Sequence, residues 1–125
     1  MIYPVIQVAL GSAIGGVARY AVGQAVARGF GPGFPLATLM VNVIGSFAIG
    51  LIGVALAARG AQGLAPFLMV GLLGGFTTFS AFSLDALTLL EGGRMGMAFF
   101  YIGASVLLSL LAAAAGLALG RGIFA

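Results

Sequence analysis

The sequence predicts an all-α membrane protein with a single domain of four transmembrane helices, the third of which is broken at mid-membrane. Of its 125 residues, 62% are hydrophobic and only 6% are charged, whereas a soluble domain carries about 25% charged residues. The chain also divides into four apolar segments, each close to the roughly 20 residues that cross the hydrocarbon of a bilayer. Its 22 glycines are typical of helices that approach one another closely inside a membrane.

The predicted spans are separated by short segments rich in glycine, proline or charge. The first ends before a loop with two prolines and three glycines, and the third ends at the sequence EGGR. Pro66 suits the first turn of the third helix. The start of the chain lacks the basic n-region of a signal peptide, so we interpret it as a retained span. We expect the four spans at residues 4–27, 36–58, 66–90 and 95–119.

The third span contains a segment that should interrupt its helix. Gly74-Gly75 has no side chains to pack and Thr77-Thr78 is a β-branched pair, so both pairs lower helix propensity. Backbone groups that a break frees at membrane depth are tolerated only where protein buries them or where they line a cavity. The break therefore predicts an element that handles an ion.

The arginines indicate no single orientation in the membrane. With an even number of spans, Arg59 and Arg121 lie on the side of both termini, and Arg28 and Arg94 lie on the other. Arg19 adds a third positive charge to the second side if it is counted. Because the difference between sides sets the orientation, this balance predicts insertion both ways up. We therefore hypothesise an antiparallel, dual-topology homodimer, in which two copies form the inverted repeat of larger transporters.

Composition excludes several classes of function. The chain has five arginines, no lysine and no basic cluster, so no nucleic-acid partner is expected. It has no cysteine and no histidine, which excludes disulfides, thiolate sites and imidazole–metal sites.

Arg19 and Asn42 are the polar residues of the first two spans that need a partner. Arg19 lies about two helical turns inside its span, and an intramembrane arginine normally faces a partner or a water-filled cavity. An ion pair with Asp85, at a similar depth, and a cationic vestibule for an anion both remain open. Asn42 either makes an interhelical hydrogen bond or lines an anion path as a donor. It belongs to a polar stripe at four-residue spacing: Thr38, Asn42, Ser46 and Gly50.

The third and fourth spans combine aromatic and hydroxyl side chains. Phe79 and Phe82 follow the break at helical spacing, with Ser80 and Ser83 one step round the helix. They either pack against lipid and core or line an anion path, because aromatic rings carry positive edges. In the fourth span Tyr101, Ser105 and Ser109 share one face. Their hydroxyls either bond back to the helix or form a polar track.

Three sequence motifs resemble the fluoride channels of the Fluc family, also called CrcB. Residues 15–20 (GGVARY) are similar to the first-helix motif of that family, and residues 38–50 (TLMVNVIGSFAIG) to its second-helix motif. Residues 71–82 (GLLGGFTTFSAF) are similar to the motif of its broken third helix. The resemblance covers the whole chain, and three motifs in this order and spacing are highly specific.

The resemblance implies a multi-pass channel of the bacterial inner membrane that exports fluoride passively as an antiparallel homodimer in the lipid bilayer. It also implies one Na⁺ at the dimer axis, held by backbone carbonyls of Gly74 and Thr77 from both subunits.

The resemblance further assigns the anion pathway. Phe79 and Phe82 correspond to the aromatic box that contacts fluoride, Asn42 to the pore asparagine, and Ser80 and Ser83 to hydroxyl positions beside it. The fourth-helix residues that fit the polar track of the family are Tyr101, Ser105 and Ser109. Ala81 departs from the pattern, because the family usually has threonine there.

Two other functions explain the sequence less well. A small four-helix multidrug/proton antiporter needs a membrane-embedded carboxylate, typically in its first helix, whereas this chain has only Asp85 and Glu91, both late in the third span or after it. A structural membrane subunit would leave the midspan break and the hydroxyl faces unexplained.

Overall fold

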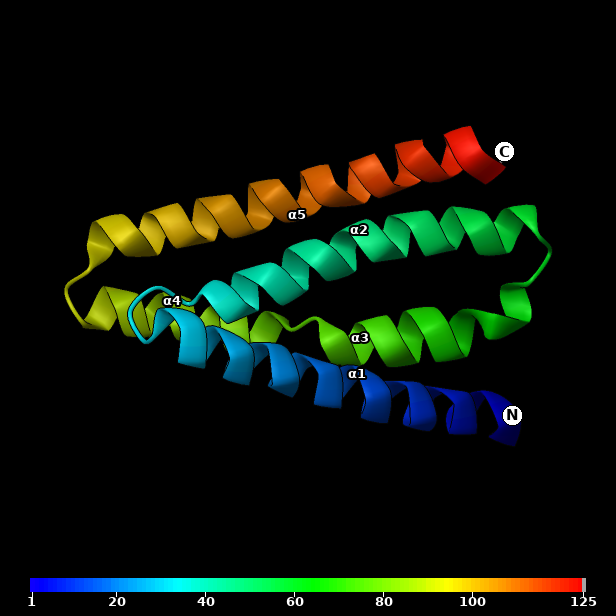
Figure 1. Ribbon diagram of the computed structural model, residues 1–125, viewed down its shortest axis with the longest axis horizontal. Helices are drawn as coiled ribbons and strands as arrows, with labels where there is room; N and C mark the ends of the chain where they lie inside the picture. The colour runs from blue at the N-terminus through cyan, green and yellow to red at the C-terminus, as the bar shows by residue number, and fades with distance from the viewer. Residues whose placement is uncertain (125) are drawn as a thin grey trace.

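The computed structural model describes residues 1–124, which form four long helical rods running alternately up and down (Figure 1). No strand occurs within residues 1–124. Residue 1 and residue 124 lie at the same end of the bundle. The elements are α1 (Ile2–Phe30), α2 (Leu36–Ala58), a 3₁₀ turn (Gln62–Leu64), a π-helical segment (Pro66–Leu73), α3 (Gly74–Phe76), α4 (Phe79–Glu91) and α5 (Met95–Phe124).

Each rod is long and apolar enough to cross a membrane, and together they match the four predicted spans. The shortest, α2, has 23 residues, which extend about 35 Å at 1.5 Å per residue. The first and last rods are longer than the sequence predicted, since α1 continues through Arg28 to Phe30 and α5 continues to Phe124. The loop after α1 is correspondingly shorter than the glycine- and proline-rich stretch predicted for it.

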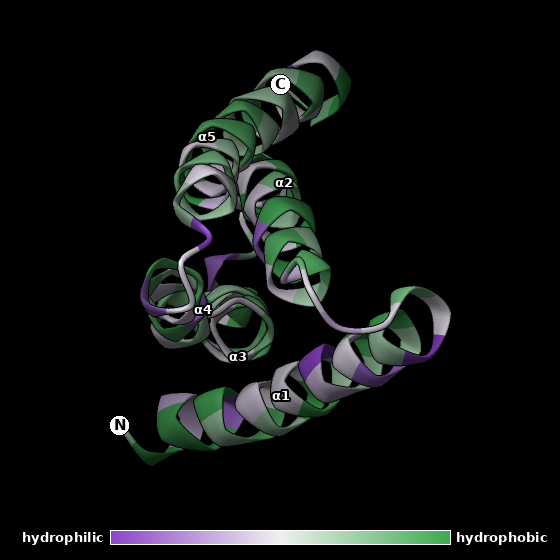
Figure 2. Cartoon of the chain, turned by 90° about the vertical axis from the view of Figure 1, so that its left-hand side faces the viewer, coloured by the Kyte–Doolittle hydropathy of each residue, from purple (hydrophilic) through white to green (hydrophobic). Residues whose placement is uncertain are grey.

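The helices pack as two close pairs, α2 with α5 and α1 with the first half of the third rod (Figure 2). Glycines allow both approaches. A Cβ atom on Gly50 would lie 2.5 Å from the Ala113 carbonyl oxygen, and one on Gly75 would lie 2.9 Å from the Ser12 carbonyl oxygen. Since real Cβ atoms do not come this close to backbone, neither helix pair would fit together with alanine at these positions.

The third rod is interrupted at Thr77 and Thr78, whose backbones are extended (φ −87°, ψ 162° and φ −155°, ψ 125°). The prediction that Gly74-Gly75 also breaks the helix was wrong, because Gly74 keeps helical angles (φ −62°, ψ −34°). The low helix propensity of glycine is overridden here by packing, since Gly75 lies against α1. The helix resumes at Phe79, where the Thr78 hydroxyl caps it by accepting from the Ala81 N–H at 3.1 Å.

The buried core is small and lies between α4 and α5, where Phe82, Ala86 and Leu89 pack against Ala98 and Tyr101. Most of the outer surface is apolar, as the hydropathy colouring of Figure 2 shows. In water such a surface would be unfavourable, whereas lipid chains solvate it. The arrangement is therefore that of a membrane protein with lipid as its solvent.

Candidate ion pathway

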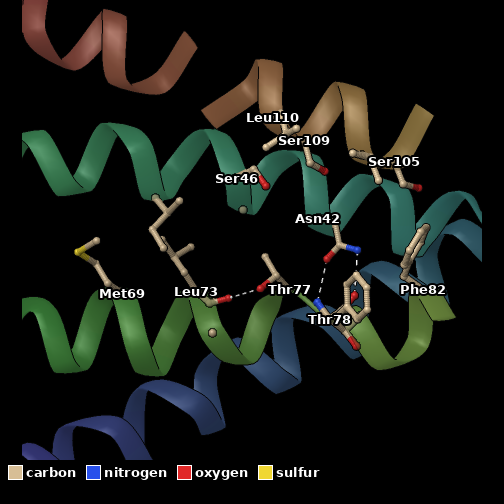
Figure 3. A pocket seen from close by; sticks show the side chains of 15 residues that line it. Asn42, Ser46, Met69, Leu73, Thr77, Thr78, Phe82, Ser105, Ser109 and Leu110 are labelled. Atoms are coloured by element: carbon tan, nitrogen blue, oxygen red, sulfur yellow. Dashed lines mark hydrogen bonds between the residues drawn. The ribbon is translucent and has the colours of Figure 1, made fainter. Parts of the chain in front are cut away.

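A cavity of about 410 Å³ lies between α2, the broken third rod and α5 (Figure 3). It brings together most of the residues that the sequence singled out, from three separate helices. These are Asn42, Gly74, Thr77, Phe79, Phe82, Ser105 and Ser109. No charged side chain from the described part of the chain lines it.

Asn42 holds the break in place through both ends of its side-chain amide. Its Oδ1 accepts from the Thr78 N–H at 2.8 Å and its Nδ2 donates to the Thr78 carbonyl at 2.9 Å (Figure 3). The interhelical hydrogen bond expected of Asn42 is thus present. A primary amide has two N–H groups, and the Thr78 carbonyl takes one of them.

The break changes which donors serve the backbone carbonyls before it. The Thr78 N–H would bond the Gly74 carbonyl in a continuous helix, but it donates to Asn42 instead. The Ala81 N–H would likewise bond the Thr77 carbonyl, but it donates to the Thr78 hydroxyl. The carbonyls of Gly74 and Thr77 have therefore lost their helical donors beside the cavity.

Arg19 and Asp85 do not pair. The Nε of Arg19 donates to the Gly75 carbonyl at 3.1 Å, which supplies a partner to another carbonyl next to the break. Asp85 Oδ2 accepts from the Thr38 hydroxyl at 2.8 Å and from the Tyr101 hydroxyl at 3.1 Å. The ion pair considered from the sequence is thus not formed, and each group instead bonds a neutral partner on another element.

The two phenylalanines after the break differ in their surroundings. Their ring centroids are 5.4 Å apart, yet Phe79 is 76% exposed and Phe82 only 8%. Phe82 also packs on the Tyr101 ring at 5.3 Å. Phe82 is therefore a fixed wall of the cavity, and Phe79 stands at its open side.

The hydroxyl groups fall into two sets. Ser105 is 5% exposed and its Oγ has no hydrogen-bond partner within residues 1–124, and Ser109 lines the same cavity. Buried hydroxyls are normally satisfied, so Ser105 has capacity to bind something in the cavity. Three other predicted hydroxyls lie outside the lining and bond elsewhere: Ser80 with Thr78, Ser83 with the Phe79 carbonyl, and Tyr101 with Asp85.

Ser46 and Thr78 also line the cavity, although the sequence did not single them out as site residues. The four-residue spacing from Asn42 could have identified Ser46. Thr78 could have been recognised as an N-cap three residues before Ala81, at the start of an apolar helix.

Comparisons with known proteins show the family of the chain. Residues 6–117 match the family described as CrcB-like protein, Camphor Resistance (CrcB). A relative from Paracoccus denitrificans is 57% identical over 120 residues, which cover 96% of each chain. A relative from Cereibacter sphaeroides is 56% identical, and the alignment covers 98% of each chain. A relative from Agrobacterium fabrum is 54% identical, and the alignment covers 94% of this chain and 95% of the relative. All three are named fluoride-specific ion channel FluC.

The family match spans most of the chain, and the relatives are identical at more than half of the aligned positions over almost its full length. The chain therefore belongs to the CrcB family.

Proposed function

We propose that this protein is a fluoride-specific ion channel, through which fluoride leaves the cell passively. The observation that carries the choice of ion is the 57% identity, over 96% of the chain, with a relative named as such a channel. The same names favour an ion channel over an enzyme, a multidrug/proton antiporter or a structural subunit. As expected for a channel, the four long apolar helices make the protein a multi-pass membrane protein.

The chemistry of the cavity supports an anion path. Ser105, Ser109 and the remaining N–H of Asn42 offer hydrogen-bond donors, and the rings of Phe79 and Phe82 offer positive edges. Because no charged side chain lines the cavity, an anion would be solvated there without being trapped, as conduction requires.

We also include in the proposed pathway the three hydroxyls that lie outside the cavity lining, those of Ser80, Ser83 and Tyr101. Tyr101 lies one turn from Ser105 and continues the polar line of α5 toward Thr38 and Asp85. Ser80 and Ser83 lie on the first turns of α4 near Phe79, where Ser80 is exposed like Phe79 and Ser83 is half-buried.

A second, antiparallel copy would complete the site. The open side of the cavity and the 76% exposed ring of Phe79 are the features that support such a dimer. The balanced arginines support insertion both ways up. If labelling of a C-terminal tag in intact cells found it on one side of the membrane in every copy, the antiparallel dimer would be refuted.

The carbonyls of Gly74 and Thr77 fit a Na⁺ ion, because both have lost their helical donors and hard cations prefer oxygen ligands. Na⁺ bound there would compensate these carbonyl dipoles in hydrocarbon. We expect replacement of Na⁺ by N-methylglucamine to lower the thermal stability of the dimer, since a ligand that binds only the folded state stabilises it. An unchanged unfolding temperature would argue against the site.

We place the channel in the bacterial inner membrane. There the membrane potential, negative inside, drives anions outward, at about 2.3 kcal/mol per charge for each 100 mV. A passive pore is therefore sufficient to clear fluoride from the cytoplasm, and no coupling to an energy source is needed.

The test is fluoride efflux from liposomes that contain the purified protein, with chloride as the comparison ion. We expect fluoride to leave much faster than from empty vesicles, and chloride to stay inside. Folded protein that released no fluoride above empty vesicles would refute the channel. Equal release of both ions would refute its specificity.

A further inference from the structure

A second cavity, of about 640 Å³, opens between the C-terminal ends of α2 and α5. It lies at the end of the bundle where the chain terminates in Figure 1, away from the α4–α5 loop. The lining residues are Gly53, Val54, Ala57, Ala58, Leu117, Arg121 and Phe124. We refer to this cavity as the terminal groove.

The terminal groove carries two positive charges at its mouth. Arg121 is the one charged residue among residues 1–124 that line it. Arg59 lies beside the groove, with Cζ 5.3 Å from the centroid of the Phe124 ring. This cation–π contact holds the Arg59 side chain at the rim. The two acidic residues of the chain, Asp85 and Glu91, belong to α4, whose Glu91 end lies at the opposite end of the bundle (Figure 1). Within residues 1–124, no acidic side chain therefore lies at this mouth.

The walls below the arginines are apolar and shallowly recessed. Gly53, Ala57 and Ala58 have little or no side chain, which leaves room between the helices. From Ala58 to Gly53 this recess descends about 8 Å along α2, at 1.5 Å per residue. It thus runs from the predicted membrane surface into the hydrocarbon.

We propose that the terminal groove binds an anionic phospholipid, with the phosphate between Arg121 and Arg59 and an acyl chain along Gly53 and Ala57. An inorganic anion would meet the same arginines, but the apolar walls would offer it no further donors. A phospholipid matches both the charged mouth and the apolar recess of the groove. Its headgroup pairs with the guanidinium groups, and its acyl chain covers the recess. This site does not depend on fluoride conduction.

Native mass spectrometry of the detergent-solubilised protein tests the proposal. We expect phosphatidylglycerol to stay bound more than phosphatidylcholine with the same acyl chains. Each arginine near an anionic headgroup contributes about fivefold in affinity, so Arg121→Gln together with Arg59→Gln should lower phosphatidylglycerol retention to the level of phosphatidylcholine. The matched control is Arg28→Gln, an exposed arginine in the last turn of α1, which should leave retention unchanged.

A second variant tests the recess. Ala57→Leu places a large side chain in the groove and should lower phosphatidylglycerol retention, whereas Ala118→Leu, on an exposed part of α5 outside the groove, should not. Competition by soluble glycerol phosphate equal to that of phosphatidylglycerol would mean an anion site without a lipid, and would overturn the proposal. Equal retention of both lipids by the wild type, or no loss in the double arginine variant, would also overturn it.

Discussion

The two halves of the third rod, before and after Thr77-Thr78, present different chemistry to the same cavity. The first half packs its glycines against α1. Where it ends, the carbonyls of Gly74 and of Thr77 in the interruption lack their helical donors. The second half packs Phe82 and its neighbours against α5 and contributes side chains. A single interruption of two residues thus separates a segment suited to a cation from one suited to an anion.

The difference has a physical cause. Glycine allows the first half to approach α1 closely, and on its cavity side this half presents Met69, Leu73 and Gly74, none of which has a side-chain hydrogen-bond donor. The second half has a hydrophobic contact with α5 instead, so bulky side chains line its cavity side. Four sets of variants test this contrast.

The largest effect is expected for Asn42→Asp, at the joint between the halves. The carboxylate keeps an acceptor for the Thr78 N–H but loses the donor to the Thr78 carbonyl. It also places a negative charge in the proposed anion path, where repulsion at 4 Å amounts to about 4 kcal/mol. We expect fluoride efflux from liposomes to fall at least about a hundredfold. Ser46→Ala, one turn away on the same face, is the control, and wild-type efflux from the aspartate variant would contradict an anion path at Asn42.

The phenylalanines come next, and their different burial should separate their effects. Phe82→Ile removes part of a buried ring and should lower both efflux and thermal stability, the latter by about 1–2 kcal/mol. Phe79→Ile alters a ring that is 76% exposed in one copy, so it should lower efflux about tenfold while the fold is kept. Efflux and unfolding are measured on the same preparations. If neither variant changed efflux, the rings would serve packing alone.

Thr78 and Thr77 should differ in their effect on stability. Thr78→Val removes the hydroxyl that caps α4, which should cost about 1 kcal/mol in the free energy of unfolding. Thr77→Val removes only a hydroxyl that bonds the Leu73 carbonyl at 3.0 Å, a carbonyl that the Thr77 N–H already serves, so its cost should be below about 0.5 kcal/mol. Thr78→Ser, which keeps the capping oxygen, should be close to wild type in denaturant titration. If the Thr78 cap contributed nothing, Thr78→Val and Thr77→Val would have equal free energies of unfolding.

The smallest effect is expected for Arg19→Gln. The Nε bond to the Gly75 carbonyl is exposed, so its loss should cost at most about 1 kcal/mol. Glutamine has a shorter side chain, so its amide N–H should bond the Gly75 carbonyl more weakly than Arg19 does. Arg19→Ala has no donor and should be less stable than Arg19→Gln. If Arg19 instead attracts anions, Arg19→Gln would reduce efflux strongly at low salt and little at high salt, without a change in stability.

The sequence was sufficient for the four spans and for the existence of a break, because span length and apolar composition are strong local patterns. The sequence offered both Gly74-Gly75 and Thr77-Thr78 as helix-breaking pairs, and only the threonines break the rod. Sequence could not decide between them, because whether a glycine bends or packs depends on the opposing helix, here α1. Residue type also could not decide the partner of Asp85, which is set by how α2 and α5 lie relative to α4. Five of the seven site residues that meet at the cavity were identified by motif, whereas Ser105 and Ser109 were predicted from the hydroxyl face of the fourth span. Tyr101 shares that face but lies fully buried beside Asp85.

The double bond between Asn42 and Thr78 has a consequence for how the third rod can move. Thr78 is extended, and the side-chain amide meets its N–H and C=O as the peptide group of an adjacent β-strand would. A single asparagine therefore acts as one rung of a sheet inside a helical bundle. The corner at Thr78 is fixed to α2 rather than free to act as a hinge. These two bonds therefore restrict how far the backbone oxygens before Thr78 can move relative to the phenyl rings after it.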